Sequence, residues 1–104
     1  MTEYNPGFQG ETSLEQRQDL KEPPMFRVLL HNDDYTTMEF VVDILMNVFH
    51  KTHEESIQIM LKVHQEGVGV CGIYTYDIAQ TKVNAVLRLA TEHEFPLKST
   101  LEQV

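Results

Sequence analysis

The 104-residue sequence contains one cysteine, Cys71, no tryptophan and few basic residues. A single cysteine excludes a disulfide within the chain and favours a reducing compartment. Eight lysines and arginines against sixteen aspartates and glutamates give a formal net charge of -8, which disfavours nucleic acid or an anionic membrane surface as a partner. No apolar run approaches the roughly 18 residues of a membrane-spanning helix, and the first residues lack the basic and apolar regions of a signal peptide. We therefore expect a cytoplasmic protein.

What is present is the composition of one small domain. With 41% apolar and 23% charged residues, the chain has room for a single hydrophobic core. Residues 1–24 hold few core-forming side chains without a sustained period, so we expect a flexible N-terminal extension that ends at Pro23 and Pro24. Residues 25–104 form the expected core domain. The pattern gives no reason to expect more than a monomer.

Strand and helix patterns alternate along residues 25–104. A short apolar strand precedes two helices joined by a tight connection, then come a glycine-containing strand, a third helix and a polar edge strand. The strands are expected at 26–30, 68–74 and 97–102, and the helices begin after Thr36, Thr52 and Thr75. The order βααβαβ predicts an α/β (α+β) two-layer sandwich in which three helices pack on a small three-stranded sheet.

Capping residues mark the expected helix boundaries. Thr36 with Glu39, and Thr52 with Glu55, have the T-x-x-E spacing of a capping box, and Gly67 is placed to end the second helix. The third helix is amphipathic, with core positions at Ala79, Val83, Val86, Leu87 and Ala90. Its outward positions are Asp77, Gln80, Lys82, Asn84 and Arg88.

Two adjacent carboxylates, Asp33 and Asp34, follow Asn32 in the turn between the first strand and the first helix. Their simplest role is to cap the helix, because Asp is favoured at such positions. The apolar stripe of the second helix, however, ends in His64, and antiparallel packing of the two helices would bring this imidazole toward the turn. An amide oxygen, a carboxylate and an imidazole nitrogen would then lie beside Met38, Val41, Met60 and Val63.

Acceptors beside an apolar concavity suit a primary ammonium attached to a hydrophobic side chain, such as a free protein N-terminus with a bulky first residue. Methionine walls can close on different large side chains because the thioether is flexible. The alternative from the enzyme class is a divalent-metal-dependent hydrolase that uses the Asp33/Asp34 pair, although no phosphate-holding lysine, arginine or glycine loop adjoins the turn. Cys71 lies within an apolar strand and fits a core residue better than a nucleophile.

Five segments of the chain match a known pattern: 32–42 (NDDYTTMEFVV), 60–67 (MLKVHQEG), 71–72 (CG), 81–83 (TKV) and 96–102 (PLKSTLE). Together they closely resemble the ClpS family of adaptor proteins, from about Pro24 to the C-terminus. The resemblance implies a protein that is not an enzyme and needs no cofactor or metal. It implies that substrates with N-terminal Leu, Phe, Tyr or Trp are bound and delivered to the ClpA unfoldase of the ClpAP protease in the bacterial cytoplasm.

The resemblance also assigns roles to single residues. Asn32, Asp33 and His64 would bind the α-amino group, and Thr36 the first peptide unit. Asp34 would support the turn or face the peptide. The side-chain pocket would be formed by Leu30, Met38, Val41, Met60, Val63 and Leu97, with Met38 as the gate against β-branched residues.

The same resemblance places the surface that docks on the N-terminal domain of ClpA at the start of the third helix, with Asp77 and Lys82. Gln80 stands where the family commonly has an acid. The N-terminal extension would engage the unfoldase during hand-over. A further possibility is a general interaction domain that uses the exposed face of the third helix, with the pocket residues serving only as core.

Overall fold

A computed structural model of the protein describes residues 22–104 and has the order βααβαβ, as predicted. The elements are β1 (Met25–His31), α2 (Met38–Asn47), α3 (His53–Glu66), β2 (Val68–Thr75), α4 (Tyr76–Glu92) and β3 (Lys98–Gln103). The predicted extension lies outside the described residues except for its last three, 22–24. Within residues 22–104, no helix is long and apolar enough to cross a membrane.

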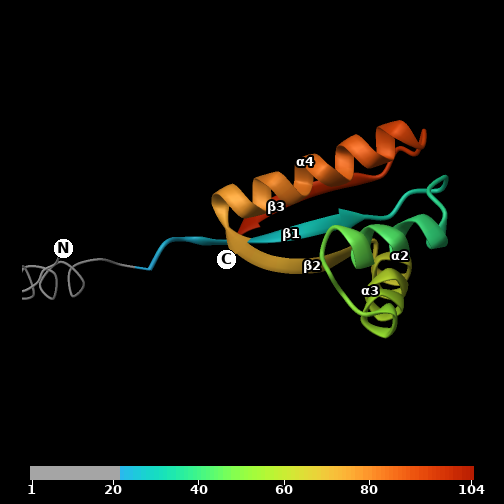
Figure 1. The fold of residues 1–104 in the computed structure, drawn as a ribbon. Coiled ribbons are helices and arrows are strands. Elements are labelled where there is room, and N and C mark those ends of the chain that lie inside the picture. The colour runs from blue at the N-terminus through green and yellow to red at the C-terminus, as the bar shows by residue number, and fades with distance from the viewer. Residues whose placement is uncertain (1–21) are drawn as a thin grey trace, which may run out of the picture.

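The sheet has three antiparallel strands in the order β2-β1-β3, so the first strand is central (Figure 1). The register between β1 and β2 shifts between Val28 and Leu29, because Val28 is opposite Gly72 while Leu29 is opposite Val70. Cys71 is therefore the extra residue of a β-bulge, and its side chain is buried. The glycine-containing strand thus has the irregularity that its composition suggests.

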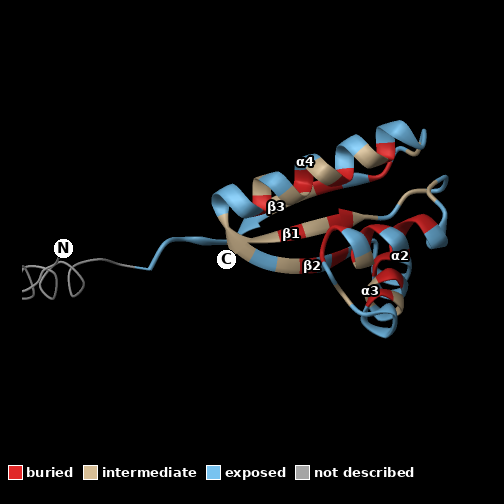
Figure 2. Ribbon diagram, in the orientation of Figure 1, coloured by how far each residue is buried: buried red, intermediate tan, exposed pale blue. Residues whose placement is uncertain are grey.

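The helices and the sheet share one core. Helix α4 lies along the sheet, whereas α2 and α3 form a pair at the end of the sheet where β1 finishes (Figure 1). Val28 and Leu30 of β1 are fully buried, and the buried parts of the helices face inward toward them (Figure 2). The predicted two-layer sandwich is confirmed.

Helix α3 is delimited as predicted and packs closely on β2. Thr52 and Glu55 form the expected capping box, with hydrogen bonds of 3.1 and 2.9 Å. Gly67 ends the helix in the left-handed region at φ 89°, where glycine carries no steric penalty. A Cβ at Gly69 would lie 2.7 Å from a methyl of Val63, so this glycine lets α3 approach the strand.

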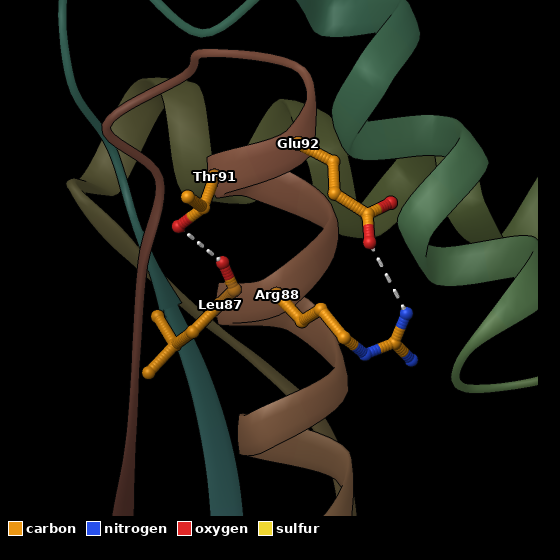
Figure 3. Close-up of polar contacts among 4 residues, drawn as sticks. All are labelled: Leu87, Arg88, Thr91 and Glu92. Atoms are coloured by element: carbon orange, nitrogen blue, oxygen red, sulfur yellow. Dashed lines mark hydrogen bonds and ion pairs between the residues drawn. The ribbon is translucent and has the colours of Figure 1, made fainter.

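Two predictions for α4 are wrong. Leu87 is 40% exposed, because the positions spaced at 79, 83, 86 and 90 already occupy the face toward the sheet. Lys82, expected to face outward, is half-buried and donates from Nζ to the carbonyl of Val48 at 2.7 Å. Figure 3 shows the exposed end of the helix, where Thr91 donates to the Leu87 carbonyl at 2.9 Å and Arg88 lies 3.7 Å from Glu92.

We expect Leu45→Ala to lower the free energy of unfolding by about 2–5 kcal/mol, because Leu45 is fully buried and its loss leaves a cavity. Leu87→Ala removes the same atoms from an exposed position and should cost less than about 1 kcal/mol. Urea unfolding followed by circular dichroism measures both. Equal losses would contradict the placement of Leu87 outside the core.

Candidate functional site

The turn after β1 is organised by the carboxylate of Asp33. Its Oδ1 accepts from the backbone N–H groups of Tyr35 at 2.8 Å and Thr36 at 2.7 Å, and its Oδ2 accepts from the Thr36 hydroxyl at 2.7 Å. These three bonds close a local turn that needs no support from Asp34, which is exposed. The turn-supporting role that the resemblance allowed for Asp34 therefore belongs to Asp33.

The predicted capping box at Thr36 and Glu39 is wrong. Helix α2 begins one residue later, and its N-cap is Thr37, whose Oγ1 accepts from the N–H of Phe40 at 3.1 Å. Thr36 cannot act as the cap because its hydroxyl is turned back to Asp33. Two adjacent threonines thus have different tasks, one in the turn and one in the helix.

A backbone hydrogen bond ties this turn to the end of α3. The N–H of Asn32 donates to the carbonyl of Gly67 at 2.9 Å. His64 lies in the last turn of α3, one turn before that glycine. The bond therefore brings the His64 end of α3 to the Asn32–Asp33 turn, as the antiparallel packing of α2 and α3 predicted.

Between these elements lies a cavity of about 230 Å³. It is lined by Asn32, Asp33, Asp34, Thr36, Met38, Val41, Met60, Val63 and His64. Val41, Met60 and Val63 are buried, whereas Met38 is 44% exposed and His64 is also exposed. The cavity therefore has an apolar interior, and its exposed lining residues are one methionine and polar groups.

Eight of the ten residues predicted for the α-amino, peptide and pocket roles line this cavity, and two do not. Leu30 and Leu97 have exposed fractions of 0% and 4% and belong to the core. A ligand contact for these two stays a prediction. Asp77 and Lys82 line a separate cavity of about 530 Å³ between α4 and the end of α2.

Among residues 22–104, no lysine or arginine lines the site. Partial burial raises the pKa of the Asp33 carboxyl, but the hydrogen bonds from Thr36 and Tyr35 outweigh this effect and leave the pKa below its ordinary value. Asp33 is therefore ionised at neutral pH. Since a carboxylate offers about four lone-pair positions and three are occupied, one acceptor position remains for a ligand donor.

The site is not the largest concavity among the residues that the structure describes. A hollow of about 560 Å³ lies between α3 and the sheet, but its lining mixes Arg27 and Lys62 with Glu66 and Glu102. The cavity at Asp77 likewise contains Lys82 and Arg88. The smaller site differs from both because its acceptors are not neutralised by basic side chains.

Cys71 has no access to any of these cavities. It is 1% exposed, and burial raises the pKa of its thiol to about 12. It is thus a small core residue, as predicted. Among residues 22–104, no group of three or more His, Cys, Asp and Glu side chains is arranged to hold a metal ion.

Sequence reasoning missed two features of the site. The first is the capping role of Thr37. Thr36 and Thr37 are equally suitable as N-caps, so the sequence pattern alone does not choose between them. The second is the hydrogen bond between Asn32 and Gly67. It joins segments that are far apart in the chain, so no local sequence pattern indicates it.

We expect Thr36→Val to raise the pKa of Asp33 toward its ordinary value, because the bond from the hydroxyl to Oδ2 is lost. The depressed pKa of Asp33 gives stability that is present above the unfolded pKa and is lost as pH falls through the folded pKa, so the variant should lose less stability on acidification. A carboxyl NMR titration measures the shift.

The matched control is Thr37→Val. It removes the cap of α2 and should cost about 1 kcal/mol of stability in urea unfolding. The pKa of Asp33 should stay unchanged. If Thr37→Val moved that pKa and Thr36→Val did not, the assignment of the two threonines would be reversed.

The family model for "ATP-dependent Clp protease adaptor protein ClpS" matches residues 21–100. ClpS adapter proteins of Syntrophus aciditrophicus and Lawsonia intracellularis are 48% and 53% identical, covering 99% and 97% of this chain and 96% and 94% of those proteins. The structure of Agrobacterium tumefaciens ClpS2 bound to L-phenylalaninamide has a TM-score of 0.78 and 36% identity, covering 80% of this chain and 100% of that one. The chain belongs to the ClpS family of Clp protease adaptors, which are not enzymes.

Proposed function

We propose that the protein binds the free α-amino group and the bulky hydrophobic first side chain of its substrates and delivers them to the ClpA unfoldase. The observation that carries this proposal is the similarity to A. tumefaciens ClpS2, whose structure is bound to L-phenylalaninamide. That ligand has a free amino group, a benzyl side chain and a carboxamide in place of a first peptide unit. The acceptors of Asn32, Asp33 and His64 suit the amino group, and the apolar interior suits the benzyl group. Thr36 suits the carboxamide.

The amino group is the charged part of the ligand. An ammonium has three donors, and the lining residues Asn32, Asp33 and His64 offer an amide oxygen, a carboxylate and an imidazole nitrogen. A hydrogen bond to a charged group contributes about 1.5–3 kcal/mol net. Acetylation of the amino group removes the charge and two of the donors, so the acceptors would be left without partners. Discrimination against blocked N-termini follows from that cost.

The first side chain would enter the apolar interior. Burying the roughly 150–250 Å² of an aromatic side chain contributes about 4–6 kcal/mol before ordering costs. Val41, Met60 and Val63 are already buried, so the interior is preformed. Met38 is half-exposed at the edge, where its side chain would close on a γ-branched or aromatic residue and collide with a β-branched one.

The metal-dependent hydrolase alternative is not retained. The adaptors of this family are not enzymes, and Asp33 is engaged by Thr36 and Tyr35. Within the part of the chain that the structure describes, Asp34 is the only other carboxylate that lines the cavity. The pair therefore does not offer two unengaged carboxylates.

A Clp protease adaptor implies a Clp unfoldase as its partner, and we place the docking surface for the N-terminal domain of ClpA around Asp77. Asp77 is exposed in the first turn of α4 and lines the cavity of about 530 Å³. Lys82 lines the same cavity, but its ammonium is held by the Val48 carbonyl. Its contribution would be to fix the end of α2 beside Asp77. Residues 1–24 would engage the unfoldase during hand-over in the cytoplasm.

We expect labelled peptides that begin with Phe or Leu to bind, and the same peptides that begin with Val or N-acetyl-Phe not to bind. Fluorescence anisotropy measures this. Each lost charged hydrogen bond should weaken binding by roughly tenfold or more. Met38→Ala should admit the Val peptide, because the half-exposed side chain at the edge of the cavity is removed.

The control for this series is Met46→Ala, which truncates a methionine that does not line the cavity. It should leave the exclusion of Val intact. Equal binding of the free and acetylated Phe peptides would rule out recognition of the amine.

We expect Asp77→Lys to weaken binding to ClpA at least tenfold while the affinity for the Phe peptide is unchanged, because Asp77 lines a different cavity from the peptide site. Isothermal titration calorimetry with ClpA measures the first, and anisotropy the second. Glu66→Lys makes the same charge change at an exposed residue outside this cavity. If Glu66→Lys weakened binding to ClpA as much, net charge rather than the surface at Asp77 would be responsible.

A further inference from the structure

One face of the sheet is exposed although it carries apolar side chains. Val28 and Leu30 face the core that α4 shares, so the alternate positions of β1 and the residues opposite them form the other face, which we call the open face (Figure 1). Its side chains are Met25, Arg27, Leu29 and His31 on β1, Val68, Val70, Ile73 and Thr75 on β2, and Lys98, Thr100 and Glu102 on β3.

The centre of the open face is apolar and hollowed. Val70 and Ile73 are 43% and 50% exposed, and Leu29 is partly exposed. Leu29 and Val70 also line the hollow of about 560 Å³ between α3 and the sheet. Neighbouring apolar side chains that are exposed in a concavity mark a surface for another polypeptide segment.

The open face also differs in charge from the rest of the molecule. Arg27 and Lys98 lie on it, and Lys62 lines the hollow. The carboxylates there are those of Glu66 and Glu102. Elsewhere in the part of the chain that the structure describes, there are ten carboxylate side chains against three lysines and arginines. The open face therefore favours an apolar segment that carries acidic side chains.

Residues 1–21 have this chemistry and are attached beside the open face. Their carboxylate side chains outnumber their basic ones by four to two, and their apolar side chains include Leu20. The segment leads into Met25, which lies on the open face and is 37% exposed. Leu20 is five residues before Met25, a span of up to about 17 Å, and Leu29 lies about 13 Å along β1. A reversal of the chain can therefore bring Leu20 to Leu29.

We propose that residues 1–21 fold back on the open face, with Leu14 and Leu20 on its apolar centre and Glu15 and Asp19 toward its basic side chains. Attachment gives the segment an effective concentration of the order of millimolar, so contacts too weak to hold a separate protein suffice. A second copy fits less well, because a two-fold interface on this face would set the hollow against itself.

Docking makes the segment a reversible cover that a partner has to displace. In the proposed function, residues 1–24 engage the unfoldase, so hand-over includes release of this segment from the open face. That consequence rests on the proposed function, whereas the docking itself does not.

The test is methyl NMR of the full chain with a spin label on Gln16→Cys. Cys71 is 1% exposed and burial raises the pKa of its thiol to about 12, so it takes up no label. We expect the methyl signals of Ile73 to lose more than about half of their intensity and those of Ile78 to keep theirs. Both side chains are 50% exposed, but Ile78 lies on α4. Equal losses at the two isoleucines would overturn the proposal.

Variants of the open face and of the segment locate the contact. Val70→Glu should restore the Ile73 signals, because it adds a negative charge under an acidic segment. Leu87→Glu makes a matched change at a residue that is 40% exposed on α4 and should leave the loss unchanged. Leu20→Gln changes only the segment, so it tests the contact without altering the sheet, and it should also restore the signals. Retention of the loss in both Val70→Glu and Leu20→Gln would contradict the docking.

A mixed sample separates the chain's own segment from that of a second copy. Spin-labelled chains without isotope are mixed with methyl-labelled chains without spin label, and the Ile73 signals should then keep their intensity. A loss as large as in the singly labelled chain would show contact between two chains and overturn the fold-back. Binding of the Phe peptide is measured on the same samples, so its failure would concern the proposed function and not the docking.

Discussion

The hydrogen bond from the Asn32 N–H to the Gly67 carbonyl holds together the segments on which the site depends. Gly67 ends α3 in a left-handed conformation, and the next residue, Val68, begins β2 opposite His31 at the end of β1. The end of the central strand, the end of α3 and the start of β2 therefore meet at one point. His64, in the last turn of α3, is brought to the turn after β1 because this junction is short and rigid.

At that junction, Asp33 has two tasks that require the same charge. The bonds from Thr36 and Tyr35 hold the turn, and they also keep the carboxylate ionised by lowering its pKa. An acceptor for an ammonium must be ionised and must not move when the ligand leaves. A carboxylate already fixed by three donors meets both requirements, whereas a free surface aspartate would lose rotamer entropy on binding. Local folding thus preorganises the proposed amine site.

Prediction from the sequence succeeded where the signal was local or periodic. The order of the elements, the capping box at Thr52 and the end of α3 at Gly67 follow from residues that are neighbours in the chain.

The errors arose where two neighbouring residues are chemically equivalent, or where the hydrogen-bond partner of a side chain lies far away in the sequence. Thr36 and Thr37 are chemically alike, and only the position of Asp33 separates their roles. The anchoring of Lys82 by the Val48 carbonyl depends on how α4 packs on α2, which no local pattern contains. The cavity was predictable because the spacing on two antiparallel helices determines which residues face each other.

Helix α2 links the two surfaces that the proposed function requires. Its first residue, Met38, borders the cavity at Asp33, and its C-cap, Val48, accepts a hydrogen bond from the Lys82 ammonium beside the cavity at Asp77. The helix has ten residues, so the two ends are about 15 Å apart. A substrate and an unfoldase domain placed at opposite ends would not compete for the same side chains. Ile44 and Leu45, between these ends, are almost fully buried, which makes the helix a rigid spacer. An adaptor built in this way would deliver its cargo by holding two partners at a fixed separation.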